Sequence, residues 1–198
     1  MTKKSIEIIE RYPQRSPLCI ADHLKHIIKS RVVCELGSRK GDIARLFSQH
    51  ASKVIGVERN EDFYKEAVEH SKDIANLEFI RQDFLKNGIP DADVYYLHVS
   101  PKVISEALKT IKDSQHDCTV ICGTTSSYTP SSALTQKIHN YQKNFGGYII
   151  PIELKNSKRA RYTVDGVSRY EKIKHPEYNL KYNDLWEMWI VDISQINL

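Results

Sequence analysis

Short apolar runs alternate with amphipathic stretches along the chain, and this alternation restricts it to few folds. The runs cover residues 32–36, 54–58, 77–80, 94–99 and 118–122. Apolar residues recur at helical spacing between several of them, as in Ile43 and Phe47, or Ile104, Leu108 and Ile111. Strands that alternate with helices form a parallel sheet covered on both faces. The sequence therefore predicts an α/β, Rossmann-like three-layer sandwich.

The last third of the chain departs from this pattern. One more helical stripe over residues 134–141 is followed by two consecutive β-like runs, 148–154 and 185–193. Two strands in succession predict a mostly parallel seven-stranded sheet with an antiparallel edge strand. Residues 155–184 form a polar insertion between these runs, and its Asp165-Gly166 pair is a strong hairpin-turn signal.

No linker or internal repeat divides the chain, so a single domain over residues 1–198 is expected. Its first 31 residues are interpreted as an N-terminal helical region. Within them, Ser16-Pro17 is expected to open a helix that carries Ile20, Leu24 and Ile28 on one face.

Composition excludes several classes of protein. No apolar run approaches the roughly 20 residues that a membrane span needs, and the N-terminus carries acids where a signal peptide is apolar. The four cysteines lie in apolar patterns without metal-ligand spacing, which indicates reduced core thiols and no metal site. A cytoplasmic protein is the expectation.

Glycines and acids stand where the predicted strands end. Gly37 and Gly41 follow the first run, and Glu35 lies inside it. Glu58 ends the second run, about 20 residues after Gly37, which suits an acid that accepts hydrogen bonds from ribose hydroxyls. Asp83 and Phe84 follow the third run. Because ligands of open α/β sheets bind at the carboxyl ends of the strands, these residues form the candidate site.

This order of motifs resembles the class I S-adenosylmethionine-dependent methyltransferases, whose first strand leads into an acid-x-Gly-x-x-x-Gly loop. The resemblance implies S-adenosyl-L-methionine as cofactor. It implies that Gly37, Ser38 and Gly41 pack on the methionine part, with Glu35 facing its amino group. The roles implied for the other strand ends are ribose binding by Glu58 and adenine binding by Asp83 with Phe84. The chain departs from the family pattern at Arg39, where many relatives have glycine.

The end of the fourth run bears on the methyl acceptor. The Asp/Asn-Pro-Pro-aromatic tetrad of enzymes that methylate base amines is absent. Residues 92–98, Ala-Asp-Val-Tyr-Tyr-Leu-His, are similar to the corresponding part of small single-domain protein-lysine methyltransferases. By that similarity Tyr96 and His98 would line an acceptor channel, and His98 would receive an ammonium proton. A core role for Tyr96, a hydrogen-bonded strand end at His98 and a turn-capping role for Asp83 remain open.

Three functions are compatible with these patterns. They are a methyltransferase acting on a protein lysine amine, an RNA methyltransferase, and a non-catalytic S-adenosylmethionine-binding protein. The net charge of +4 conceals a basic segment from Lys155 to Lys174. Its cations are interleaved with Tyr162 and Tyr170. This pattern is compatible with a solvated hairpin and also with docking of an acidic macromolecule, either protein or RNA. The sequence sets neither the identity of the acceptor nor the oligomeric state.

Overall fold

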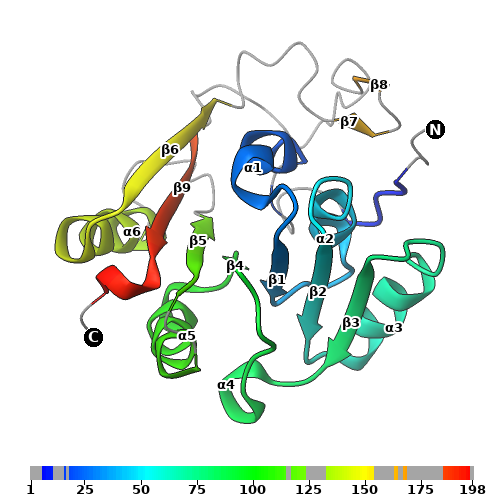
Figure 1. The fold of residues 1–198 in the computed structure, drawn as a ribbon, viewed down its shortest axis with the longest axis horizontal. Helices are drawn as coiled ribbons and strands as arrows, with labels where there is room; N and C mark the ends of the chain where they lie inside the picture. The colour runs from blue at the N-terminus through cyan, green and yellow to red at the C-terminus, as the bar shows by residue number, and fades with distance from the viewer. Residues whose placement is uncertain are drawn as a thin grey trace.

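A computed structural model describes residues 6–10, 16, 18–114, 117–123, 133–153, 163–164, 167–168 and 185–196. Its main sheet has seven strands in the order β3-β2-β1-β4-β5-β9-β6 (Figure 1). The strands are β1 (Val32–Leu36), β2 (Lys53–Glu58), β3 (Leu77–Arg81), β4 (Val94–Leu97), β5 (Thr119–Gly123), β6 (Tyr148–Glu153) and β9 (Leu185–Asp192).

The pairing of the strands confirms the expected sheet. Strands β3, β2, β1, β4 and β5 are parallel to one another. Strand β9 lies second from the edge and is antiparallel to both β5 and the outer strand β6. The chain order reverses between β1 and β4, which are adjacent in the sheet. This reversal opens the crevice at the carboxyl ends of the strands where ligands of such sheets bind.

Seven helical segments accompany the sheet. They are α1 (Ile20–Ile28), α2 (Asp42–Phe47), α3 (Glu61–Glu69), α4 (Phe84–Asn87), α5 (Pro101–Ser114), α6 (Ala133–Phe145) and the 3-10 helix η1 (Ile193–Gln195) among the described residues. Side-chain alternation along the strands makes two cores. Val33 and Val54 pack with α1 and α2, whereas Cys34 and Ile55 pack with α5 on the opposite face (Figure 1).

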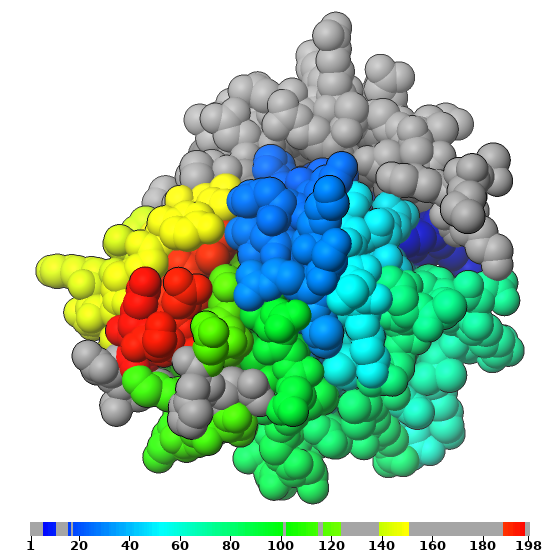
Figure 2. All heavy atoms as spheres, in the orientation of Figure 1, coloured from blue at the N-terminus to red at the C-terminus, as the bar shows by residue number. Residues whose placement is uncertain are grey.

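The start of α1 corrects the sequence-based prediction. The helix begins at Ile20, with Cys19 at its N-cap, and does not begin at Ser16-Pro17. Ser16 lies outside any helix, and residues 6–10 are also non-helical, so the region 1–31 is helical only over α1 in the part described. Figure 2 shows α1 spread over the middle of one face of the molecule, beside α2. Asn60 caps α3, where its side chain accepts the N–H of Phe63, and α5 begins at Pro101, directly after Ser100.

Little of the insertion 155–184 lies within the described residues. Strands β7 (Thr163–Val164) and β8 (Val167–Ser168) pair in antiparallel register around the predicted turn. Asp165 and Gly166 themselves lie outside the described residues, as do the Ser/Thr-rich loop 124–132 and the seven basic residues of the segment from Lys155 to Lys174. All four cysteines are buried, and none of them forms a disulfide bond. No described helix is long and apolar enough to cross a membrane.

Candidate functional site

The turn after β1 depends on two glycines with left-handed backbone. Gly37 has φ +82° and Gly41 has φ +76°. The N–H groups of Gly37 and Ser38 donate to the carbonyl of Val57 over 2.8 and 3.0 Å, which fastens the turn to β2. A Cβ at Gly41 would lie 2.4 Å from the ring of Phe79. The turn therefore requires glycine at position 41 for both its conformation and its packing.

Glu35 lies on β1 on the face covered by α1 and α2, and the residue is 6% exposed. It accepts a hydrogen bond from the backbone of Ala44. Its Oε2 atom has no hydrogen-bond partner among the described residues. Burial raises the pKa of Glu35 well above its ordinary value, and the nearby carboxylates of Asp42 and Glu10 raise it further. A buried carboxyl group is thus left with unused hydrogen-bonding capacity.

A small cavity of about 20 Å³ adjoins Glu35. The Oγ atom of Ser38 also has no hydrogen-bond partner among the described residues. The cavity holds about one water molecule at this size. Its lining comes from the N-terminal segment, the glycine turn, α2 and the end of β4, and consists of Glu10, Ser16, Glu35, Gly37, Ser38, Arg39, Asp42, Ile43 and His98.

Glu58 ends β2 and holds the glycine turn from the other side. Its carboxylate accepts the backbone N–H of Arg39 over 2.8 Å and that of Asn60 over 2.7 Å. Glu58 is 7% exposed. Beyond it lies a wider hollow of about 560 Å³, lined by Arg59, Asn60, Arg81, Gln82 and Asp83. Glu58 therefore stands between the small cavity and this larger hollow, because its donor Arg39 lines the cavity and its donor Asn60 lines the hollow.

Asp83 and Phe84 occupy different environments. Asp83 lines the larger hollow and caps α4, where its side chain accepts the N–H of Leu85 over 3.2 Å. The turn-capping role left open for Asp83 is thus observed, and it leaves the other carboxylate oxygen 3.9 Å from Arg59. Phe84 does not line the hollow. It is 9% exposed and packs in the core on the α5 face.

The end of β4 carries a hydrogen-bonded chain of three side chains. Ser16 Oγ lies 2.6 Å from Tyr96 Oη and 2.9 Å from His98 Nδ1. Tyr96 is fully buried, packs edge-on against Phe47 and does not line the cavity. Burial, with a smaller contribution from Arg39, lowers the pKa of His98 to about 4. His98 is therefore neutral at physiological pH, and Tyr96 reaches the site only through Ser16.

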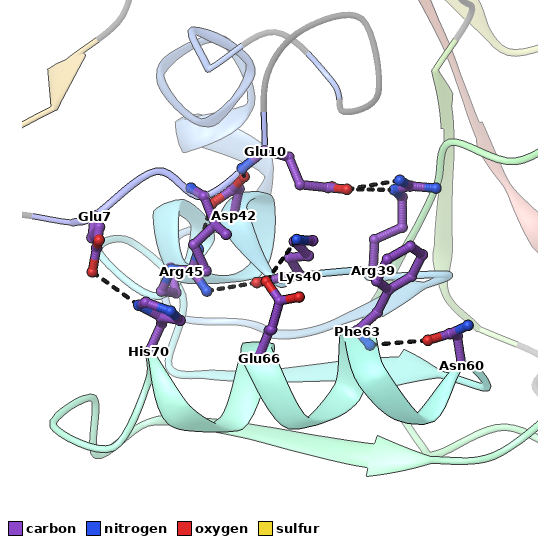
Figure 3. Close-up of polar contacts among 11 residues, drawn as sticks. Glu7, Glu10, Arg39, Lys40, Asp42, Arg45, Asn60, Phe63, Glu66 and His70 are labelled. Atoms are coloured by element: carbon purple, nitrogen blue, oxygen red, sulfur yellow. Dashed lines mark hydrogen bonds and ion pairs between the residues drawn. The ribbon is translucent and has the colours of Figure 1, made fainter.

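The N-terminal segment is fastened over this end of the sheet (Figure 3). Asp42 accepts the backbone N–H groups of Ile9 and Glu10 over 2.8 and 2.7 Å and also pairs with the buried Arg45. Glu10 accepts a hydrogen bond of 2.8 Å from Arg39 Nε and forms an ion pair of 2.8 Å with Arg39 Nη2. The Arg39 guanidinium lies 4.6 Å from the centre of the Phe63 ring. Arg39, which stands where many relatives have glycine, thus binds the N-terminal segment beside the cavity.

Glu10, Ser16 and Asp42 belong to the site, although the sequence does not predict them there. Ser16 before Pro17 is typical of a helix start, and the sequence carries no signal for the contacts of Glu10, which depend on the docking of a distant segment. No group of three or more metal-ligating side chains occurs among the described residues.

Comparison with known proteins identifies the fold. No family model and no curated protein sequence matches the chain. Several solved structures do resemble the chain. An RNA methyltransferase from Salinibacter ruber in complex with S-adenosyl-L-homocysteine superposes with a TM-score of 0.57 at 15% identity, covering 93% of this chain and 96% of that one.

A tRNA (m1A58) methyltransferase from Aquifex aeolicus gives a TM-score of 0.60 at 17% identity over 93% of this chain and 72% of that one. The C-terminal domain of precorrin-6Y C5,15-methyltransferase from Rhodobacter capsulatus gives 0.62 at 6% identity over 91% of each chain. The strand order, the glycine turn and these likenesses together show that the chain has the class I fold of S-adenosylmethionine-dependent methyltransferases.

Proposed function

We propose that this protein is an S-adenosylmethionine-dependent methyltransferase. The observation that carries the proposal is a pair of buried polar atoms at the glycine turn, Glu35 Oε2 and Ser38 Oγ, for which the described part of the chain offers no hydrogen-bond partner. Buried polar atoms are nearly always hydrogen-bonded, so two such atoms at one cavity indicate a place for a polar ligand group. The structures from Salinibacter ruber and from Thiobacillus denitrificans contain S-adenosyl-L-homocysteine, which supports this choice of ligand.

The residues around the small cavity and the larger hollow carry polar groups that suit each part of the cofactor. Glu35 and Ser38 would receive the amino group of its methionine end, beside the turn of Gly37 and Gly41. Glu58, between the two hollows, would accept hydrogen bonds from the ribose. Asp83 would hold the adenine in the larger hollow, which is wide enough at about 560 Å³. Phe84 is left out of this proposal because its ring packs in the core.

When bound, the cofactor supplies a methyl group on a positively charged sulfur, and catalysis consists chiefly of aligning the acceptor with it. His98 lines the cavity and would orient the acceptor by hydrogen bonding. Ser16 would hold the His98 ring through Nδ1, and Tyr96 would hold Ser16. Tyr96 is accordingly a positioning residue in this proposal.

For the acceptor, we propose RNA ahead of a protein lysine. A neutral His98 with a pKa of about 4 is a poor base for a lysine ammonium, whose ordinary pKa is about 10.4. That proton transfer would be uphill by roughly 9 kcal/mol. An RNA base needs no proton removed when a ring nitrogen lone pair attacks. The neighbours from Salinibacter ruber and Aquifex aeolicus are RNA and tRNA methyltransferases, which supports the same class.

Two experiments test these proposals. Calorimetric titration of the full chain with S-adenosyl-L-methionine and S-adenosyl-L-homocysteine should give saturable binding, and absence of binding to both would overturn the cofactor assignment. Incubation with methyl-labelled cofactor and cell extract should then label material that nuclease removes. Label that is lost only to protease would favour the lysine acceptor. Binding without transfer to any fraction would favour a non-catalytic cofactor-binding protein.

A further inference from the structure

A further hollow lies at the other end of the sheet, where the parallel strands begin. It has a volume of about 530 Å³ and is lined by the end of α1, the first residues of β5 and β6 and the last residues of β9. Figure 2 shows α1 in blue beside the yellow surface of β6 and the red surface of β9 on this face. Arg31 precedes β1 and Gly37 follows it, so this amino-end hollow lies roughly 20 Å along the strand from the glycine turn.

An aromatic ring stands at the rim of the amino-end hollow. Tyr148, the first residue of β6, is 50% exposed. Its partner in the antiparallel ladder is Ile190, and paired side chains lie on the same face of a sheet, so the Tyr148 ring lies on the α1 face. The residue before it, Gly147, has φ +74°, and a Cβ there would lie 2.3 Å from the carbonyl oxygen of Ile190. This close approach to β9 requires glycine, and it fixes the place where β6 and the Tyr148 ring begin.

A fixed hydrogen-bond donor and a fixed acceptor lie side by side in the same hollow. Arg31 donates from Nη1 to Oγ1 of Thr119 over 3.3 Å and from Nη2 to the carbonyl oxygen of Asp93 over 3.0 Å. The hydroxyl of Thr119 in turn donates to Oδ1 of Asp192 over 3.4 Å. A guanidinium carries five N–H donors and a carboxylate has about four acceptor sites, so both groups retain capacity for a ligand. Arg31, Thr119 and Asp192 all line the hollow.

We propose that the amino-end hollow binds one unpaired nucleotide of a single-stranded RNA. The inference rests on the proposed function, because RNA is the acceptor class proposed there. The Watson–Crick edge of an unpaired base presents donors and acceptors side by side, which matches the pairing of Arg31 with Asp192. The Tyr148 ring stacks on the base. Lys29, which lines the hollow, is exposed and forms no ion pair with another described residue, so it pairs with a backbone phosphate.

An acidic peptide would suit the hollow less well than a nucleotide. Asp192 would repel the carboxylates of a peptide, whereas it can accept a hydrogen bond from a base. Every base has a flat face that stacks on an aromatic ring, and a volume of about 530 Å³ lies in the range of sites that hold a small molecule. Base pairing would hide the edge that Arg31 and Asp192 contact, so the hollow selects a single strand over a duplex.

Fluorescence anisotropy with a labelled RNA of about 12 nucleotides, titrated with the full chain, tests the docking site. Tyr148→Ala should weaken binding of the single strand by about 5-fold or more, whereas Tyr148→Phe keeps the ring and should bind like the wild type. Neither change should alter binding of the same RNA annealed to its complement. Lys29→Glu should weaken binding and reduce its salt dependence. The matched variant Lys109→Glu makes the same charge change on the exposed side of α5 and should have a smaller effect.

Binding of S-adenosyl-L-homocysteine separates this inference from the proposed function. All four variants should bind it as the wild type does, which also shows that they fold. Tyr148→Ala that binds single-stranded RNA like the wild type, or that weakens single strand and duplex equally, would overturn the docking site and leave the proposed function intact. Displacement of the RNA from the hollow by a polyglutamate peptide, with an affinity that also depends on Lys29, would make the hollow a site for an acidic protein and overturn the inference. Single-strand binding that depends on Tyr148 in a chain that does not bind S-adenosyl-L-homocysteine would support the docking site and overturn the proposed methyltransferase.

Discussion

The backbone N–H of Arg39 donates to Oε2 of Glu58 over 2.8 Å, which joins the glycine turn after β1 to the last residue of β2. The other oxygen of Glu58 accepts the N–H of Asn60. Each carboxylate oxygen can accept more than one hydrogen bond, so Glu58 retains capacity for a ligand hydroxyl. Glu58 thus both holds the glycine turn in place and can accept a hydrogen bond from a ligand.

Glu58→Ala should therefore weaken binding of S-adenosyl-L-methionine by roughly 10- to 100-fold, since it removes hydrogen bonds to the ligand and to the turn. Calorimetric titration measures the affinity. Glu78→Ala on the neighbouring strand β3 is the matched control, because Glu78 is 48% exposed and pairs only with Lys53 among the described residues. Equal affinities of Glu58→Ala and wild type would contradict the ribose-binding role.

Glu35→Gln should stabilise the ligand-free protein increasingly as pH rises. Because the pKa of Glu35 is raised by folding, the folded state keeps a proton that the unfolded state loses above its ordinary pKa. Between those two pKa values the wild type loses about 1.4 kcal/mol of stability per pH unit, and the glutamine variant does not. Urea denaturation at several pH values measures the difference. A gap that stays constant or narrows with rising pH would show that Glu35 is ionised in the free protein.

The strand ends could be predicted from sequence because their signals are local. Apolar runs fix the strands, and the parallel arrangement then brings Glu35, Gly37 and Glu58 to one end of the sheet. The position of Phe84 could not be predicted in this way. Its adjacency to Asp83 in the sequence suggests a shared site, but α4 begins at Phe84, and the ring packs in the core on the α5 face of the sheet.

The docking of the N-terminal segment at the site could not be predicted, because it depends on contacts between residues that are far apart in the sequence. Ser16 reaches Tyr96 across 80 positions of the chain, and Glu10 reaches Asp42 across 32. A serine before a proline is a common helix-start pattern, and the local sequence offers no reason to prefer the tertiary contact. Arg39 likewise gains its role only when Glu10 docks against it.

Gly41→Ala should destabilise the protein more than Gly146→Ala does. Both glycines have positive φ, +76° and +77°, so each substitution carries a conformational cost of about 1 kcal/mol. A Cβ at Gly41 would also meet the Phe79 ring at 2.4 Å, whereas a Cβ at Gly146 would meet only the side chain of Gln195, at an ordinary contact distance of 3.7 Å. We expect the Gly41 variant to lose about 1–3 kcal/mol more in urea denaturation. Similar losses for the two variants would mean that Phe79 moves aside freely.

Glu10→Gln should speed the association of S-adenosyl-L-homocysteine several-fold. A cavity of about 20 Å³ is too small for an amino-acid end, so the N-terminal segment must shift before that end can bind, and the Glu10–Arg39 ion pair opposes the shift. Stopped-flow fluorescence measures the rate. Glu7→Gln is the control, since the exposed Glu7 pairs with His70 at a distance from the cavity lining. Identical association rates for wild type and Glu10→Gln would exclude this pair as the barrier.

Ser16→Ala should destabilise the protein, and adding Tyr96→Phe should recover part of the loss. The single change leaves the buried Tyr96 hydroxyl without the partner it has at 2.6 Å, which costs about 1–3 kcal/mol. The second change removes that stranded hydroxyl, so the double variant should be more stable than Ser16→Ala alone, and the cycle gives the coupling energy. Urea denaturation of all four proteins measures it. If the two changes are additive within error, Tyr96 does not depend on Ser16, and the chain that we propose to hold His98 in place is broken at its first link.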